Sequence, residues 1–70
     1  MIEKDIVITD REKEVLNLLV KGYENTEIAE ILNVTIHTVK AYVSSLIKKL
    51  GAKNRTNVIF EAIRNKIIVI

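Results

Sequence analysis

NTEIAEILNVTIHTVKAYVSSLIKKL, residues 25–50, is the stretch that decides the fold of this chain. Its first half is a short apolar cluster that ends at Asn33, a residue that readily starts a tight turn. Thr35 can then cap a second, longer helix, which we expect to run over about 36–50 until Gly51 stops it. The apolar residues of this longer helix recur at a 3/4 spacing and form its expected core side: Ile36, Val39, Val43, Leu46 and Leu50. The stretch therefore predicts two helices joined by a turn of three or four residues.

One further helix is expected on each side of this pair. Thr9 and Glu12 have the spacing of a capping box, which predicts a helix over about 10–21 before Gly22. The other helix starts can be capped as well: Asn25 or Thr26 for the short helix of the pair, and Asn54 for a last helix over about 55–65. Four short helices then account for most of the chain, so the expected fold class is all-α, with a three-helix core and a C-terminal fourth helix.

Length and composition restrict the class of protein. Seventy residues allow a single domain over 1–70, and two Gly with no Pro leave no linker. The absence of Cys excludes disulfides and thiolate metal sites and favours a reducing, cytoplasmic location. The longest apolar run, Ile67–Ile70, is far shorter than the roughly 20 residues that span a bilayer, so no membrane association is expected. This run and Ile6–Ile8 are β-branched, and both are candidates for extended segments that pack on the bundle.

Charge divides the chain into two halves. Residues 1–35 carry eight acidic and four basic side chains, for a net charge of −4, whereas residues 36–70 carry one acidic and seven basic ones, for +6. The basic half is a candidate phosphate-facing surface. Two oppositely charged surfaces that only keep the domain soluble are the alternative, because the total net charge is just +2.

The helix expected over 36–50 has an outward face suited to DNA. The side chains opposite its core side are short or basic: His37, Ala41, Ser44 and Lys48, flanked by Lys40 and Ser45. Short side chains permit close approach to base edges, and lysines can donate to guanine or phosphate oxygens. No carboxylate lies between Glu30 and Glu61 to repel DNA. These features favour a helix-turn-helix that places its second helix in the major groove.

The last expected helix has two apolar faces, and a single core cannot easily use both. One face consists of Val58, Ile59 and Ala62, and the other of Phe60, Ile63 and Ile67. The second face indicates a self-complementary dimer interface, and such a dimer would read half-sites roughly 10 base pairs apart. The alternative is that Ile6–Ile8 or the apolar C-terminal tail covers this face.

Nothing in the composition indicates an enzyme. The chain has one His and no Cys, and it has no glycine-rich loop that would cradle a phosphate. His37 has no companion ligands for a metal, and paired carboxylates such as Glu27 and Glu30 are usually solvated charge on a helix surface. We therefore expect no catalytic residues, metal, cofactor or small-molecule substrate.

Several separated motifs carry a resemblance to a known family. They are ITDREKEVL (8–16), Gly22, Asn25, EIA (27–29), Leu32, Val34, TVK (38–40), KLG (49–51) and NRT (54–56). In this order and spacing, from about Ile8 to Ile68, they resemble the LuxR-type helix-turn-helix family, and its free-standing GerE-like members in particular. We expect a free-standing member because Met1 opens a chain with no room for a receiver or autoinducer domain; a segment of a longer protein is the alternative. The resemblance implies a four-helix domain that binds DNA as a homodimer and regulates transcription, commonly as an activator that touches RNA polymerase.

The resemblance also implies roles for individual residues. Lys40, Ala41 and Ser44 match the base-reading positions of the family, Thr38 matches a phosphate-contacting hydroxyl, and Asn25 and Thr26 match the start of the scaffold helix. Three positions depart from the family: Thr26 where Lys is frequent, Tyr42 where His is usual, and Ser44 where some members have a long basic side chain. Tyr42 is expected to pack at the edge of the core, with its hydroxyl as a candidate backbone contact. Because two of the three base-reading side chains are short, the DNA backbone should be held by nearby basic residues: Lys48, Lys49, Lys53 and Arg55.

Two other functions remain open on the sequence. The first is a protein-interaction module that has lost DNA binding and docks a partner through its last helix. The second is a promoter-reading fragment that resembles part of a sigma factor, which the acidic first helix and the apolar stripe at Phe60 argue against.

Overall fold

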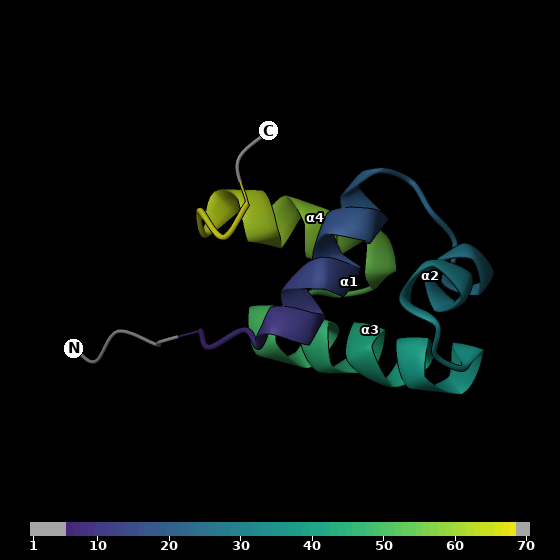
Figure 1. The fold of residues 1–70 in the computed structure, drawn as a ribbon. Coiled ribbons are helices and arrows are strands. Elements are labelled where there is room, and N and C mark those ends of the chain that lie inside the picture. The colour runs from purple at the N-terminus through teal and green to yellow at the C-terminus, as the bar shows by residue number, and fades with distance from the viewer. Residues whose placement is uncertain (1–5, 69–70) are drawn as a thin grey trace.

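The computed structural model describes residues 6–68, which form four α-helices (Figure 1). They are α1 (Asp10–Val20), α2 (Asn25–Leu32), α3 (Ile36–Leu50) and α4 (Arg55–Arg64). No strand occurs in this part of the chain, so the predicted all-α, four-helix class is confirmed. In Figure 1, α1 lies between α3 and α4, and α2 packs near the first turns of α3.

Capping side chains explain where the helices begin. The Glu12 amide donates to the Thr9 hydroxyl at 3.1 Å and the Thr9 amide donates to the Glu12 carboxylate at 2.9 Å, which confirms the capping box. Thr35 and Asn54 cap α3 and α4, also as predicted. The predicted cap of α2 is wrong: Glu24 is the N-cap residue, so Asn25 and Thr26 already belong to the helix. The reason is that Glu27 lies three residues after Glu24 and accepts its amide at 2.8 Å.

Residues in the left-handed backbone region end two of the helices. Asn33 has a φ of 56° after α2, and Gly51 has a φ of 64° after α3. α1 and α4 each end one residue earlier than predicted, because Lys21 and Asn65 are C-caps rather than helical residues. These differences do not change which side chains face the core.

One hydrophobic core lies where α1, α2 and α4 pack on α3. It contains four of the five α3 residues predicted for it, together with apolar residues of the other helices: Val15, Leu16, Leu19, Ile28, Ala29, Val39, Val43, Leu46, Leu50, Val58, Ala62 and Ile68. The prediction is wrong for Ile36, which is 39% exposed. Its side chain belongs to the first residue of α3 and leans back toward the turn, past the edge of the core.

Both ends of the described segment pack on the bundle as predicted, but Ile67 and Ile68 lie in a bend after α4 rather than in an extended segment. Ile6, Ile8 and Ile67 are half-buried against the core, whereas Val7 between the first two points outward and is 71% exposed. Ile68 is buried in the core, and the last two residues of the predicted C-terminal segment, 69–70, lie outside the described residues.

Candidate DNA-binding surface

A tight turn joins α2 to α3 and fixes the angle between them. The Val34 amide donates to the Ala29 carbonyl at 3.0 Å, and the Asn33 amide donates to the Glu30 carbonyl at 3.2 Å, so the last turn of α2 is closed. Thr35 then starts α3 by accepting the Thr38 amide at 3.1 Å. The resulting helix, three-residue turn and longer helix have helix-turn-helix geometry.

The outward face of α3 is free of the rest of the domain along most of its length. Five side chains on it are exposed: His37, Lys40, Ala41, Ser44 and Lys48. The three predicted base readers, Lys40, Ala41 and Ser44, are all among them. α3 itself carries no carboxylate, and its last turn contains Lys48 and Lys49, whose positive charge also suits the negative end of the helix dipole.

Three of the four predicted backbone contacts on α3 are only half-exposed: Thr38, Tyr42 and Lys49. Thr38 is half-buried, and its hydroxyl lies 3.0 Å from the Thr35 hydroxyl. Tyr42 is half-buried and packs against the core, which is the role expected for its ring.

The start of α2 forms a shallow hollow with the start of α4. Glu24, Asn25, Thr26 and Arg55 line this hollow. The Arg55 guanidinium donates to the Asn25 side-chain oxygen and, at 2.8 Å, to the Tyr23 carbonyl. Arg55 therefore ties α4 to the loop before α2, in addition to placing a positive charge beside the first turn of that helix.

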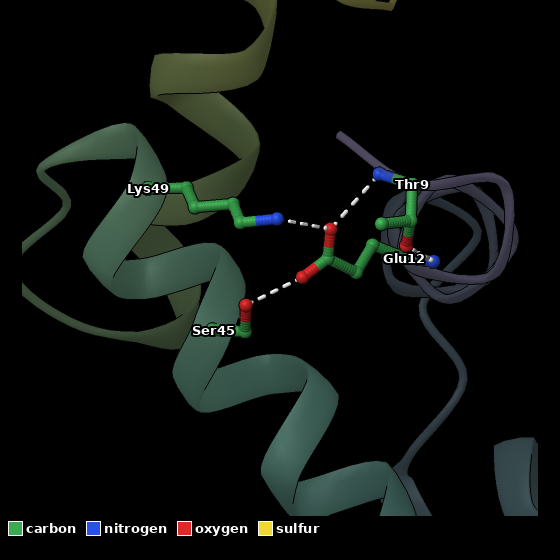
Figure 2. Close-up of polar contacts among 4 residues, drawn as sticks. All are labelled: Thr9, Glu12, Ser45 and Lys49. Carbon is green, nitrogen blue, oxygen red and sulfur yellow. Dashed lines mark hydrogen bonds and ion pairs between the residues drawn. The ribbon is translucent and has the colours of Figure 1, made fainter. Parts of the chain in front are cut away.

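A buried carboxylate between α1 and α3 holds two side chains of α3. Glu12 is 4% exposed, although it carries a charge. One carboxylate oxygen accepts the Lys49 ammonium at 2.7 Å, and the other accepts the Ser45 hydroxyl (Figure 2). Ser45, expected on the flank of the outward face, is half-buried, and its hydroxyl points to α1 rather than outward.

The surroundings of Glu12 favour its charged form. Burial alone would raise the pKa of this carboxyl, but hydrogen bonds from Lys49, Ser45 and Thr9 outweigh burial and lower the pKa from 4.5 to about 2. The sequence predicts Glu12 only as a capping residue and Lys49 only as a contact to the DNA backbone. The spacing of the sequence does indicate that Glu12 is buried, because Glu12 lies three and four residues before Val15 and Leu16 and so shares their core-facing stripe.

α4 turns one apolar face to the core and leaves another uncovered. Val58 and Ala62 are fully buried, whereas Phe60 is 59% exposed and Ile63 is 40% exposed. Neither the segment before α1 nor the described part of the C-terminal tail covers Phe60 and Ile63. Ile67 was predicted to share their stripe, but it is half-buried and packs against the core.

The described residues contain neither a cluster of metal ligands nor a membrane-spanning helix. Within 6–68, no three His, Asp or Glu side chains gather closely enough to hold a metal ion. In the same range, no helix has the length and apolar character needed to cross a membrane.

Comparisons with known proteins agree with this geometry. Residues 7–62 match the family described as bacterial regulatory proteins, luxR family. Over 62 residues the chain is 42% identical to the response regulator VraR of Staphylococcus aureus, and equally to that of Staphylococcus epidermidis. The match covers 89% of this chain but only 30% of those proteins.

A solved structure of the transcription factor GerE has the same fold. It superposes with a TM-score of 0.79 and 36% sequence identity, and the match covers 84% of this chain and 88% of GerE. The family consists of DNA-binding regulators rather than enzymes, in keeping with the non-enzymatic reading of the composition. The chain therefore belongs to the LuxR family of bacterial regulatory proteins and forms a DNA-binding helix-turn-helix domain of that family.

Proposed function

We propose that this domain regulates transcription by binding a specific double-stranded DNA site as a homodimer, with α3 in the major groove. The observation that carries the proposal is the exposed face of α3, on which Lys40 and Lys48 flank small side chains and no carboxylate occurs. Lys40, Ala41 and Ser44 read base edges, because they are exposed and because a small side chain lets the helix approach the groove floor. Two such helices related by a two-fold axis read half-sites roughly 10 base pairs apart.

The DNA backbone is held on both sides of the groove. Lys48 is the exposed cation on α3 closest to its C-terminus, and Thr38 offers a hydroxyl near the start of the helix. Asn25 and Thr26 place the first amides of α2 at the surface, where the positive end of the helix dipole attracts a phosphate. Tyr42 contributes its hydroxyl, while its ring packs against the core.

Binding to duplex DNA across a range of salt concentrations tests the proposal. We expect a steep loss of affinity between low and physiological salt, because each phosphate contact releases condensed counterions. Lys40→Ala should weaken binding to a duplex selected from a random library by roughly tenfold, the value of a base contact. Lys13→Ala is the matched control, since Lys13 is an exposed lysine on α1. Binding that is absent or independent of salt contradicts the proposal.

The dimer interface is proposed on α4. Phe60 and Ile63 are exposed on one face, and a self-complementary apolar patch is the usual basis of a two-fold interface. Phe60→Glu should give a monomer by sedimentation and weaken operator binding, since one helix then reads a single half-site. Ile31→Glu is the control, because Ile31 is 51% exposed but lies on α2 beside α1. An unchanged dimer mass for Phe60→Glu rules out this interface.

RNA polymerase is the further partner we propose. With α3 on DNA and α4 at the dimer axis, the surface left for a third partner is the acidic side formed by α1 and α2. A variant on this side, such as Ile31→Ala, should reduce transcription in a reconstituted assay while operator occupancy stays unchanged.

A bacterial regulator of this kind acts in the cytoplasm, where the chromosome lies.

A further inference from the structure

Glu12 contacts two residues of α3 that lie one helical turn apart. Ser45 and Lys49 are four residues apart on α3, and each donates to a different oxygen of the same carboxylate (Figure 2). Glu12 itself is fixed at the start of α1, because its Oε1 also accepts the Thr9 amide at 2.9 Å. Two contacts from one point on α1 to successive turns of α3 oppose rotation of α3 about its own axis.

We propose that Glu12, Ser45 and Lys49 form an internal clamp that sets the rotation of the recognition helix, so that Lys49 neutralises no DNA phosphate. The inference rests on the proposed binding of α3 in the major groove. Glu12 and Ser45 are then positioning residues, which act on DNA recognition without touching DNA. Lys48 and Lys40, which are exposed, remain as the cations of α3 that face the DNA.

The environments of the two neighbouring lysines support different roles, with Lys48 facing the DNA and Lys49 held inside the domain. Lys48 is exposed, and no hydrogen-bond or ion-pair partner is found for its ammonium among residues 6–68. Lys49 keeps 35% of its side chain exposed, but its ammonium lies 2.7 Å from a carboxylate that is only 6% exposed. Moving Lys49 to a phosphate would leave the Glu12 charge buried without its ionic partner, which is costly.

The salt dependence of DNA binding tests the role of Lys49. The double variant Glu12→Gln/Lys49→Gln keeps the net charge of the domain, so a change in its salt slope reports lost phosphate contacts. Using fluorescence anisotropy on the selected duplex, we expect the slope of log K against log salt to equal that of the unsubstituted domain. Lys48→Gln should reduce the slope by about 0.9 for each protomer. A reduction of that size in the double variant overturns the clamp.

Lysine acetylation of the unsubstituted domain gives a second measurement that needs no variant. In the presence of the duplex, Lys48 should become protected from acetic anhydride, while the reactivity of Lys49 stays as it is in the free domain. Protection of Lys49 by DNA would contradict the inference. Failure of the unsubstituted domain to bind DNA at all would instead overturn the proposed function, and the inference with it.

The positioning role predicts a loss of discrimination rather than a uniform loss of affinity. Glu12→Gln should reduce the ratio of affinities for the selected duplex and a scrambled one by roughly tenfold, since a rotated helix loses about one base contact. Glu14→Gln, on the exposed side of α1, is the control and should leave the ratio unchanged. A merely structural role of Glu12 lowers the folded fraction and therefore both affinities equally. An unchanged ratio for Glu12→Gln refutes the positioning role.

Discussion

Acid should destabilise this domain through Glu12 more than through its exposed carboxylates. The folded state lowers the pKa of Glu12 from 4.5 to about 2, so protonation is harder in the folded than in the unfolded chain. The stabilisation from this group is therefore complete well above pH 4.5 and is lost as the pH falls from there through about 2.

The size of the effect follows from the same two pKa values. At about 1.4 kcal/mol for each unit of pKa, the fall from 4.5 to about 2 corresponds to about 3 kcal/mol at neutral pH. Roughly 2 kcal/mol of this is lost by about pH 3, where the group is still charged in the folded state but largely protonated in the unfolded chain. These are upper values, because the Lys49 side chain is 35% exposed and salt screens the pair.

Urea unfolding followed by far-UV circular dichroism, at several pH values, measures this directly. The unsubstituted domain should be more stable than Glu12→Gln near pH 6, and the difference should shrink by about 2 kcal/mol near pH 3. Glu14→Gln is the control: Glu14 is exposed and lies 3.7 Å from Arg11, so its variant should track the unsubstituted domain at every pH. A difference for Glu12→Gln that does not change with pH would show that the carboxylate is not held ionised by Lys49 and Ser45.

Three further substitutions test the packing and the helix ends, each by the change in unfolding free energy in urea at neutral pH. Leu46→Ala should cost about 2–5 kcal/mol, because Leu46 is fully buried and leaves a cavity; a cost below about 1 kcal/mol would place it outside the core. Gly51→Ala should cost about 1–2 kcal/mol from backbone strain alone, since φ is 64° and an added Cβ meets nothing within 4 Å. Asn54→Ala should cost about 1 kcal/mol by removing the side-chain acceptor of the Asn57 amide, and no loss would mean that water replaces this cap.

The helices and most of the core could be predicted from the sequence because both depend on short-range patterns. Capping residues such as Thr35 act within one turn, and the 3/4 spacing of α3 places Val39 and Leu46 on one side whatever packs there. The errors in the helix bounds lie at the start of α2 and at the ends of α1 and α4. Glu24 caps α2 although Asn25 is the better cap residue by preference, because the reciprocal bond of Glu27 decides the boundary.

The contacts of Glu12 with α3 could not be predicted, since they join residues 33 and 37 positions apart in the chain. Periodicity shows that Glu12 shares a face with core residues, but it does not say which helix that face meets. The sequence therefore predicts the outward face of α3 from its position opposite the core stripe, but it groups Lys49 with Lys48 at the DNA backbone on charge alone. Only the packing of α1 on α3 separates the two lysines, one facing Glu12 and the other exposed.

The last helix shows the same difference between an apolar pattern, which the sequence reveals, and the surface that packs on it, which only the structure reveals. Two apolar faces on α4 are evident from spacing, and the structure assigns Val58 and Ala62 to the core and leaves Phe60 and Ile63 exposed. Ile67 has the spacing of the exposed face but follows the helix end, where Lys66 adopts a φ of 59° and turns the chain back toward the core. Helical spacing therefore predicts which face a residue occupies only up to the end of the helix at Arg64. The candidate dimer interface is therefore reduced to two side chains on the last two turns of α4. Burial of so small a patch contributes little free energy to dimerisation. We therefore expect dimerisation to strengthen when DNA binds two copies side by side.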